Sequence, residues 1–469
     1  MTSSIQDDAA LGRSAFRKAA FRIVPFVGLM FFINYLDRTA IGLAGPNGMN
    51  DDLALTAAQF GFASGIFFLG YILLEVPSNL GLQKFGARKW LARIMVSWGV
   101  VSVLFTWVQN YEQLWILRFV LGVAEAGFVP GAVLFLTMWF PRQYRMKALA
   151  GFYLAQPITM VLGAPLGGLL IQYGDGLFGL AGWRFMFFAV GMPAVIVGFI
   201  CYFYLTDSPS QARWLTEAER NWFVRELAAD TGDRARASGG HLSLRAVFRA
   251  PKVFAIAIAY FGLNYGVYSL AFFLPSIIAG FQEQFGTEFS IVERGLITAI
   301  PYVPAAFALY FWSRYSARVG FRQWHVAAPL LVAGLSIPVA LYMPGPATTI
   351  AVVVLTACGV TMTFSLFWSL PTTFLTGVAA AGGFALINSI ANLGGFTAPY
   401  VTGAVADATG DYRLGMILTG LTLVMSSVIV FCLRLPAAAD DERPPTEPVA
   451  PLSGPTPEPR DPDTHERTT

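Results

Sequence analysis

Long apolar runs separated by short polar breaks recur along the whole chain of 469 residues. A helix needs roughly 20 apolar residues to cross the hydrocarbon of a bilayer, and we count about twelve runs near that length. The pattern therefore predicts an all-α membrane protein with twelve transmembrane helices in two six-helix halves. The predicted spans are Phe21 to Ala44, Ala57 to Asn79, Lys89 to Val108, Leu114 to Met138, Ala148 to Ile171, Trp183 to Leu205, Val253 to Phe281, Val292 to Trp312, His325 to Leu341, Ala347 to Trp368, Ala379 to Val405 and Met416 to Leu433.

The longest polar break before the C-terminal tail runs from Thr206 to Lys252 and separates the two halves. Within it, Thr216 and Glu219 have the spacing of a capping box, and Trp222 and Phe223 follow at helical intervals. These residues predict a short amphipathic helix on the membrane surface. The predicted segments are a cytoplasmic N-terminal segment (1–20), an N-terminal six-helix bundle (21–205), a cytoplasmic linker (206–252), a C-terminal six-helix bundle (253–435) and a tail (436–469) whose Pro-rich, charged composition predicts disorder.

The composition excludes several other classes of protein. Hydrophobic residues make up 55% of the chain and charged residues only 13%, which is typical of a polytopic membrane protein. No block of Lys and Arg is interleaved with aromatic residues, so we expect no nucleic-acid partner. The three cysteines are scattered and no catalytic or metal-binding motif is present, so we expect neither an enzyme nor a cofactor other than coupling protons.

The distribution of basic residues predicts the orientation in the membrane. The breaks after the second, fourth and eighth runs carry clusters of Lys and Arg, namely Lys84, Arg88, Lys89, Arg142, Arg145, Lys147, Arg314, Arg318 and Arg322. The alternate breaks carry mainly Asp and Glu. By the positive-inside rule, both termini and the linker are predicted to be cytoplasmic.

Charged residues also lie inside the predicted spans of the first half: Asp37, Arg38, Glu75, Arg118 and Glu125. A charge at membrane depth costs at least a few kcal/mol, so it is normally kept where it faces a partner or a watery cavity. We therefore predict a substrate or proton site. The alternative for Asp37 and Arg38, which follow Asn34, is a structural ion pair that fixes helix packing.

The polar residues inside the second half are neutral, and they include Asn264, Trp368 and Asn388. We predict that the first half supplies charge chemistry and the second half supplies recognition by shape and hydrogen bonds. Asn388 could equally be a contact that joins two helices. Glu75 lies towards the cytoplasmic end of its span, so we predict a structural or gating role for it beside the basic loop that contains Lys84, Arg88 and Lys89.

The charged set has the chemistry that a symporter of organic anions needs. The planar donors of an arginine match the two oxygens of a carboxylate, and its charge is kept at any working pH. A buried Asp or Glu beside an arginine can bind a proton when a substrate changes its surroundings. Two halves of six helices are in turn typical of transporters that rock around a site near the middle of the membrane.

With these residues in place, the chain resembles the major facilitator superfamily and, within it, the anion:cation symporter family. The resemblance covers nearly everything from Phe21 to Leu435. It rests on the segments Asn34-Tyr35-Leu36-Asp37-Arg38, Arg118 to Gly127 (RFVLGVAEAG), Trp139-Phe140-Pro141-Arg142, Phe367-Trp368-Ser369-Leu370-Pro371 and Asn388 to Gly395 (NSIANLGG).

The resemblance implies a role for each matching residue. Asp37 and Glu125 match the family's proton-coupling carboxylates, and Arg38 and Arg118 match its positively charged residues in the substrate cavity. Residues at which similar transporters contact the organic acid are Tyr35, Tyr71, Gln156, Trp368 and Asn388. The tartrate, phthalate and hydroxyphenylacetate permeases of bacteria are similar, which implies uptake of a small organic anion at the inner membrane; we expect a monomer.

Two other functions stay open at this stage. One is an exporter that exchanges organic acids or drugs for protons, loosely indicated by the segment Gly163-Ala164-Pro165-Leu166-Gly167-Gly168. Two cavity arginines argue against a cationic drug as its substrate. The other is a membrane-embedded enzyme or sensor, which would need a catalytic constellation or an added soluble domain. Neither is visible in the sequence.

Overall fold

The computed structural model describes residues 2–237, 249–373, 375 and 377–433, and in these residues it contains helices and no strand. The predicted disordered tail lies outside the described residues. The long helices of the first half are α1 (Thr2–Ala44), α3 (Ala57–Phe85), α4 (Ala87–Leu104), α5 (Tyr111–Glu125), α6 (Phe128–Trp139), α7 (Arg142–Tyr153), α8 (Ala155–Gly174) and α9 (Gly182–Tyr204). Those of the second half are α12 (Pro251–Ala279), α14 (Ile291–Ala299), α15 (Tyr302–Val319), α16 (Trp324–Ala340), α17 (Pro346–Phe367), α19 (Gly377–Thr409) and α20 (Arg413–Cys432).

The other α-helices of the described residues are α2 (Met49–Asp52), α10 (Glu217–Ala237), α13 (Phe281–Phe285) and α18 (Ser369–Thr372). Ten of the described segments are long and apolar enough to cross a membrane. Together with the shorter apolar helix α16 and with α19, they make the twelve segments that the sequence predicts. The predicted fold class is thus confirmed.

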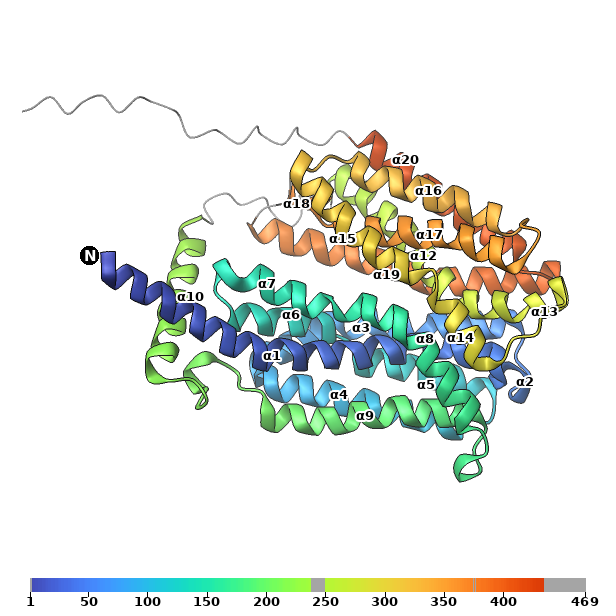
Figure 1. Ribbon diagram of the computed structural model, residues 1–469, viewed down its shortest axis with the longest axis horizontal. Coiled ribbons are helices and arrows are strands. Elements are labelled where there is room, and N and C mark those ends of the chain that lie inside the picture. The colour runs from blue at the N-terminus through green and yellow to red at the C-terminus, as the bar shows by residue number, and fades with distance from the viewer. Residues whose placement is uncertain (1, 238–248, 374, 376, 434–469) are drawn as a thin grey trace, which may run out of the picture.

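The two halves lie side by side with their long helices roughly parallel (Figure 1). The described parts of the N-terminus, α10 and α18 lie at one end of the bundle, which we call the linker end. The short helices α2 and α13 lie at the opposite end, which we call the far end. In the orientation predicted from the basic loops, the linker end is cytoplasmic.

Three predicted spans are each built from two helices rather than one. The span predicted from Leu114 to Met138 breaks after Glu125, where Gly127 has a φ of +85°, a conformation that side chains other than glycine rarely adopt. A Cβ at Gly127 would also meet the Ser78 side chain at 2.5 Å. The other two breaks fall at Leu154, between α7 and α8, and at Pro301, between α14 and α15. Proline removes an N–H donor, which accounts for the last break.

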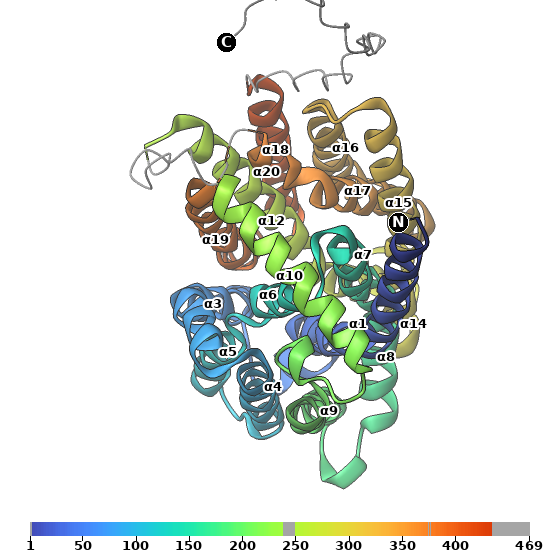
Figure 2. The same ribbon diagram turned by 90° about the vertical axis from the view of Figure 1, so that its left-hand side faces the viewer.

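The N-terminal segment and the linker helix differ from their predicted forms. The polar residues before Phe21 do not form a separate lead-in but continue α1 towards the linker end. Helix α10 lies across this extension (Figure 2), and Trp222 and Phe223 are buried there, with ring contacts to Tyr144 and Trp139. These two side chains are therefore covered by protein instead of lipid, because the extension of α1 and the helices α6 and α7 offer them a surface.

The halves contact each other closely towards the far end. A Cβ at Gly61 or Gly65 of α3 would collide with the backbone of α19, and one at Gly295 of α14 with the backbone of α8. Small residues at these positions let the helix backbones approach. The far end is therefore closed in this structure.

Each half also caps a helix of the other half at the far end. Both carboxylate oxygens of Asp407 on α19 accept hydrogen bonds from the first N–H groups of α3, those of Ala57 and Ala58, each at 2.9 Å. The side-chain oxygen of Gln172 on α8 accepts a hydrogen bond of 3.0 Å from the N–H of Val292 in the first turn of α14. The fifth span of each half thus caps the second span of the other half. We call these contacts the reciprocal caps.

Candidate functional site

Arg38 and Glu125 form an ion pair where the two halves face each other. The Arg38 Nε donates a hydrogen bond of 3.0 Å to Glu125 Oε1, and its Nη2 contacts the same oxygen. Glu125 has no exposed surface, and the side chain of Arg38 is 11% exposed. Sequence spacing indicates nothing of this pair, because the residues lie on α1 and α5, 87 positions apart.

Glu125 is the last residue of α5, directly before the break at Gly127. Transporter sites are often built at such discontinuous helices, whose exposed ends interact with ions and substrates. The second carboxylate oxygen, Oε2, has no hydrogen-bond partner among the described residues. Glu125 is therefore held through one oxygen only, by Arg38.

Aromatic side chains surround the guanidinium of Arg38. The Phe67 and Tyr71 rings of α3 lie 5.0 Å and 5.1 Å from it, within cation–π range. From the second half, the Tyr268 hydroxyl on α12 lies 3.5 Å from Arg38 Nη1. Tyr71, which the resemblance places at the substrate, is thus beside Arg38, and Arg38 is the charged residue of the first half that reaches α12.

Asp37 faces away from this interface into the first half. It is 1% exposed, and its Oδ1 accepts a hydrogen bond from Ser102 on α4. Its Oδ2 has no hydrogen-bond partner among the described residues. Asp37 and Arg38 are neighbours in sequence, yet they do not pair, since successive side chains of a helix point about 100° apart. The structural ion pair considered for these two residues is therefore absent.

Arg118 is also enclosed within the first half. It has no exposed surface, and it donates to the backbone oxygens of Ala63 (3.4 Å) and Ser64 (3.3 Å) on α3. Its guanidinium lies 5.2 Å from the Phe67 ring, on which Arg38 also packs. In this conformation Arg118 joins α5 to α3 and has no surface on which to meet a substrate.

Glu75 joins the halves instead of pairing with the basic loop. Its carboxylate accepts hydrogen bonds of 2.9 Å and 3.3 Å from the Asn388 amide on α19. In the basic loop, Arg88 pairs with Asp207 at the start of the linker, and Lys84 and Lys89 are exposed. The structure therefore gives Glu75 a partner other than the one predicted, because the Asn388 amide on α19 lies within hydrogen-bond distance of it.

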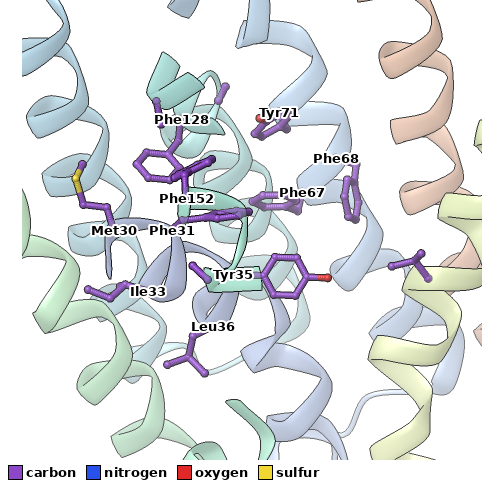
Figure 3. Close-up of a cluster of buried hydrophobic side chains, with 14 of the residues drawn as sticks. Met30, Phe31, Ile33, Tyr35, Leu36, Phe67, Phe68, Tyr71, Phe128 and Phe152 are labelled. Carbon is purple, nitrogen blue, oxygen red and sulfur yellow. The ribbon is translucent and has the colours of Figure 1, made fainter. Parts of the chain in front are cut away.

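A pocket lies beside Arg38, between α1 and α8 of the first half and α12, α14, α15 and α17 of the second half. Its empty volume of about 620 Å³ includes space that is open to solvent. Figure 3 shows the Tyr35 ring extending from α1 towards the second half with its hydroxyl leading. Among the described residues, its polar lining consists of hydroxyl-bearing side chains: Tyr35, Thr39, Thr159, Thr298, Tyr302 and Thr361.

Of the predicted contact residues, only Tyr35 is among the described residues that line this pocket. The Gln156 side chain lies beside the Tyr35 hydroxyl. Trp368 packs edge-on against Tyr260, with ring centroids 5.0 Å apart. Asn264 is 5% exposed on α12. The structure thus brings Gln156 to the pocket through Tyr35 and places Trp368 in an aromatic cluster.

Sequence reasoning missed the pocket's threonines and Ser102. A threonine in an apolar run usually satisfies its own helix backbone, so nothing in the sequence distinguishes Thr39 or Thr298. Tyr268 lies one turn after Asn264, which the sequence does indicate, but only the fold brings Tyr268 to Arg38.

Comparison with known proteins decides the family. Residues 27–384 match the family model described as Major Facilitator Superfamily. This chain belongs to the major facilitator superfamily. Two solved structures of similar fold are a D-xylose-proton symporter (TM-score 0.70, 15% identity, 89% of this chain and 98% of that one) and a bacterial homologue of the human lysosomal transporter Spinster in an inward-facing, unoccupied conformation (TM-score 0.70, 18% identity, 88% and 96%).

Relatives within the superfamily are transporters. An Agrobacterium vitis protein named "Putative tartrate transporter" is 44% identical over 89% of this chain and 90% of its own length. The Inner membrane transport protein RhmT of Escherichia coli is 32% identical over 91% and 96%. A Quinolone resistance transporter of Acinetobacter baumannii is 33% identical over 89% and 94%. The superfamily resemblance is confirmed, and the chain is a multi-pass membrane transporter and not an enzyme.

Proposed function

We propose that this superfamily member imports a small organic anion together with protons across the bacterial inner membrane by alternating access. The observation that carries the proposal is the Arg38–Glu125 ion pair beside a pocket between the halves. A transported carboxylate and Glu125 compete for the same guanidinium. The tartrate transporter name of the relative at 44% identity supports an organic acid as the substrate.

The ion pair links the proton to the substrate. A proton on Glu125 neutralises the partner of Arg38, which then binds a substrate carboxylate with its planar donors. When the substrate leaves, Arg38 again favours the ionised form of Glu125, and the proton departs. Removing one partner of a buried ion pair without replacement costs several kcal/mol, so Arg38 without either anion is the disfavoured state. Substrate and proton therefore cross together.

The remaining charged residues take supporting roles in this proposal. Asp37, on its hydrogen bond from Ser102, is the second candidate proton carrier. Arg118 joins α3 to α5, which keeps the Phe67 ring within cation–π range of the guanidiniums of Arg38 and Arg118. Glu75 and Asn388 form a contact that must break when the halves separate at this depth. In the predicted orientation, this structure is closed to the outside, since its reciprocal caps lie at the far end.

The energetics set what coupling can achieve. One unit of pH difference supplies about 1.4 kcal/mol per proton. Each net charge moved gains roughly 2.3 kcal/mol per 100 mV. A monoanion carried with one proton moves no net charge, so only the pH gradient drives it. Accumulation driven by voltage requires more protons than substrate charges.

Counterflow in proteoliposomes tests the proposal. The full-length protein would be assayed with hydroxy-dicarboxylates, sugar acids and aromatic acids, with and without an imposed pH gradient, against protein-free liposomes. We expect exchange of at least one carboxylate without a gradient, and its accumulation when the outside is acidic. Failure to exchange any carboxylate would refute the proposal. Accumulation with the gradient reversed would instead favour the exporter, a function that the name of the quinolone resistance relative also suggests.

A further inference from the structure

We infer that Arg294 on α14 forms an outer binding site for the transported carboxylate, which a substrate arriving from outside meets before it reaches Arg38. This inference rests on the proposed function and adds a second site to the path of the substrate. In the predicted orientation the far end faces outside, so an entering anion passes this end of the pocket first.

Arg294 and Asn47 lie one helical turn beyond the pocket, on opposite sides of the seam between the halves. Thr298 and Leu43 belong to the pocket lining. The Thr298 hydroxyl donates a hydrogen bond of 2.7 Å to the backbone oxygen of Arg294, and the Asn47 amide donates one of 2.8 Å to the backbone oxygen of Leu43. Both residues thus lie between the pocket and the far end, where Figure 1 shows α2 and α13.

In this conformation the two side chains close the far end of the pocket together. Arg294 donates from Nη1 to Asn47 Oδ1 at 3.4 Å and from Nε to the backbone oxygen of Phe289 at 3.1 Å. Beside them, a Cβ at Gly295 would meet the backbone oxygen of Ala164 at 2.5 Å. Because Asn47 belongs to the first half and Arg294 to the second, their contact breaks when the far end opens. The guanidinium is then left at the entrance to the pocket.

The charge of Arg294 is not neutralised by a neighbouring acid. No acidic side chain of the described residues forms an ion pair with it. The carboxylate of the adjacent Glu293 instead accepts hydrogen bonds from the N–H and the hydroxyl of Ser290, at 2.8 Å and 2.9 Å. Arg413, also in the second half, differs because it pairs with Asp411. An unneutralised cation at the mouth of a cleft raises the local concentration of anions.

Arg294 and Arg38 are far enough apart to be separate sites. Asn47, the partner of Arg294, lies nine positions after Arg38, which is roughly 14 Å along the chain of helices α1 and η1 (Gly45–Asn47). A small organic acid is shorter than this and occupies one site at a time. Binding at Arg294 therefore precedes binding at Arg38. A charge at the rim of a site acts mainly on the rate of association and makes that rate depend on salt.

Transport measured from each side of the membrane tests this inference. Right-side-out and inside-out vesicles from bacteria that express the full chain would be assayed with labelled tartrate or, where tartrate is not exchanged, with the first acid of the counterflow panel that is. Arg294→Gln should raise the KM for uptake into right-side-out vesicles at least about threefold at low salt. The increase should vanish at high salt, where the charge is screened. The KM in inside-out vesicles should stay unchanged.

Three variants separate the charge of Arg294 from its contacts. Arg413→Gln removes a positive charge that is already paired, and it should leave both KM values unchanged. Asn47→Ala breaks the contact that closes the pocket but keeps the guanidinium, so it should not raise the external KM.

Arg294→Cys, in a background without native cysteines, provides a rescue of the charge. Coupling a thiol reagent that adds an ammonium group should restore a low external KM, whereas a reagent that adds only a methyl group should not. Both labelled forms share one folded protein, so the comparison holds even if Arg294→Gln folds poorly.

Four outcomes would overturn the outer site. These are an unchanged external KM in Arg294→Gln, equal KM values for the two labelled forms of Arg294→Cys, an equal rise of KM in both vesicle orientations, and an equal rise in Asn47→Ala, which would show that Arg294 only closes the pocket. The proposed function survives each of these results. It fails separately, if no carboxylate of the panel is exchanged in counterflow.

Discussion

The reciprocal caps predict how a single side chain controls the far end of the transporter. Asp407 on α19 accepts two hydrogen bonds of 2.9 Å from the first N–H groups of α3 in the other half. These bonds can exist only while the far end is closed. The substitution Asp407→Ala therefore destabilises the closed conformation and leaves the packing within each half intact.

The magnitude follows from the chemistry of a helix N-terminus. Loss of a capping side chain costs about 1 kcal/mol, and loss of a negative charge from the positive end of the helix dipole costs about 0.5 kcal/mol more. Asp407 is exposed, so solvent screens its charge, and we use the low end of the dipole range. The sum of about 1.5 kcal/mol corresponds to roughly a tenfold increase in the ratio of far-end-open to far-end-closed molecules.

Distance measurements between spin labels can detect this shift. Cysteines at Asp51 and Glu283, exposed positions of the two halves at the far end, would carry the labels in a background without native cysteines. Asp407→Ala should raise the ratio of the longer distance to the shorter one about tenfold. Asp411→Ala is the matched control, since Asp411 bonds to the nearby Arg413 and not to the other half. Unchanged distances in Asp407→Ala would refute the role of the Asp407 cap in holding the far end closed, as would an equal change in the control.

Four further predictions concern the first half and the contact of Glu219 on α10 with Lys18 and Ser14 on α1, which we call the clasp. Glu125→Gln should retain counterflow but lose accumulation driven by a pH gradient; unchanged accumulation would remove Glu125 from coupling. Arg38→Lys should raise the KM for the transported acid at least tenfold although the charge remains, because an ammonium lacks the planar donors, and a wild-type KM would contradict this. Arg118→Lys should lower the free energy of unfolding by about 1–3 kcal/mol, because the buried backbone oxygens of Ala63 and Ser64 lose their donors. Thermal unfolding in detergent measures this loss, and unaltered stability would show that those two contacts contribute little. Burial would raise the pKa of Glu219, but hydrogen bonds from Lys18 and Thr216 outweigh burial and hold that pKa below its ordinary value. The clasp should therefore be fully formed above the ordinary pKa of glutamate. It should weaken as the pH falls through the lowered pKa of Glu219. Amide exchange in α10 against pH checks the last prediction, and Glu219→Gln should remove the dependence.

Part of the candidate site could be predicted because charged residues are costly inside a membrane and are visible in the sequence as interruptions of apolar runs. Asp37, Arg38 and Glu125 stand out as charges inside apolar runs, whatever the fold around them. Their partners could not be predicted. Ser102 is an ordinary small residue in a helix, and its bond to Asp37 depends on how α4 is rotated against α1. The enclosure of Arg118 could not be predicted either, because it depends on how α3 packs against α5.

The sequence by itself determined the number of membrane segments, their division into two halves and the class of chemistry in the first half. These follow from the length of apolar runs and from the cost of charge in lipid, both of which are local properties of the chain. Only the tertiary structure decided that Arg38 pairs with Glu125, that Arg118 is enclosed, and that each half caps a helix of the other. These depend on the rotation and depth of helices distant in sequence, which are set by close approaches of backbones such as that of Gly61 to α19.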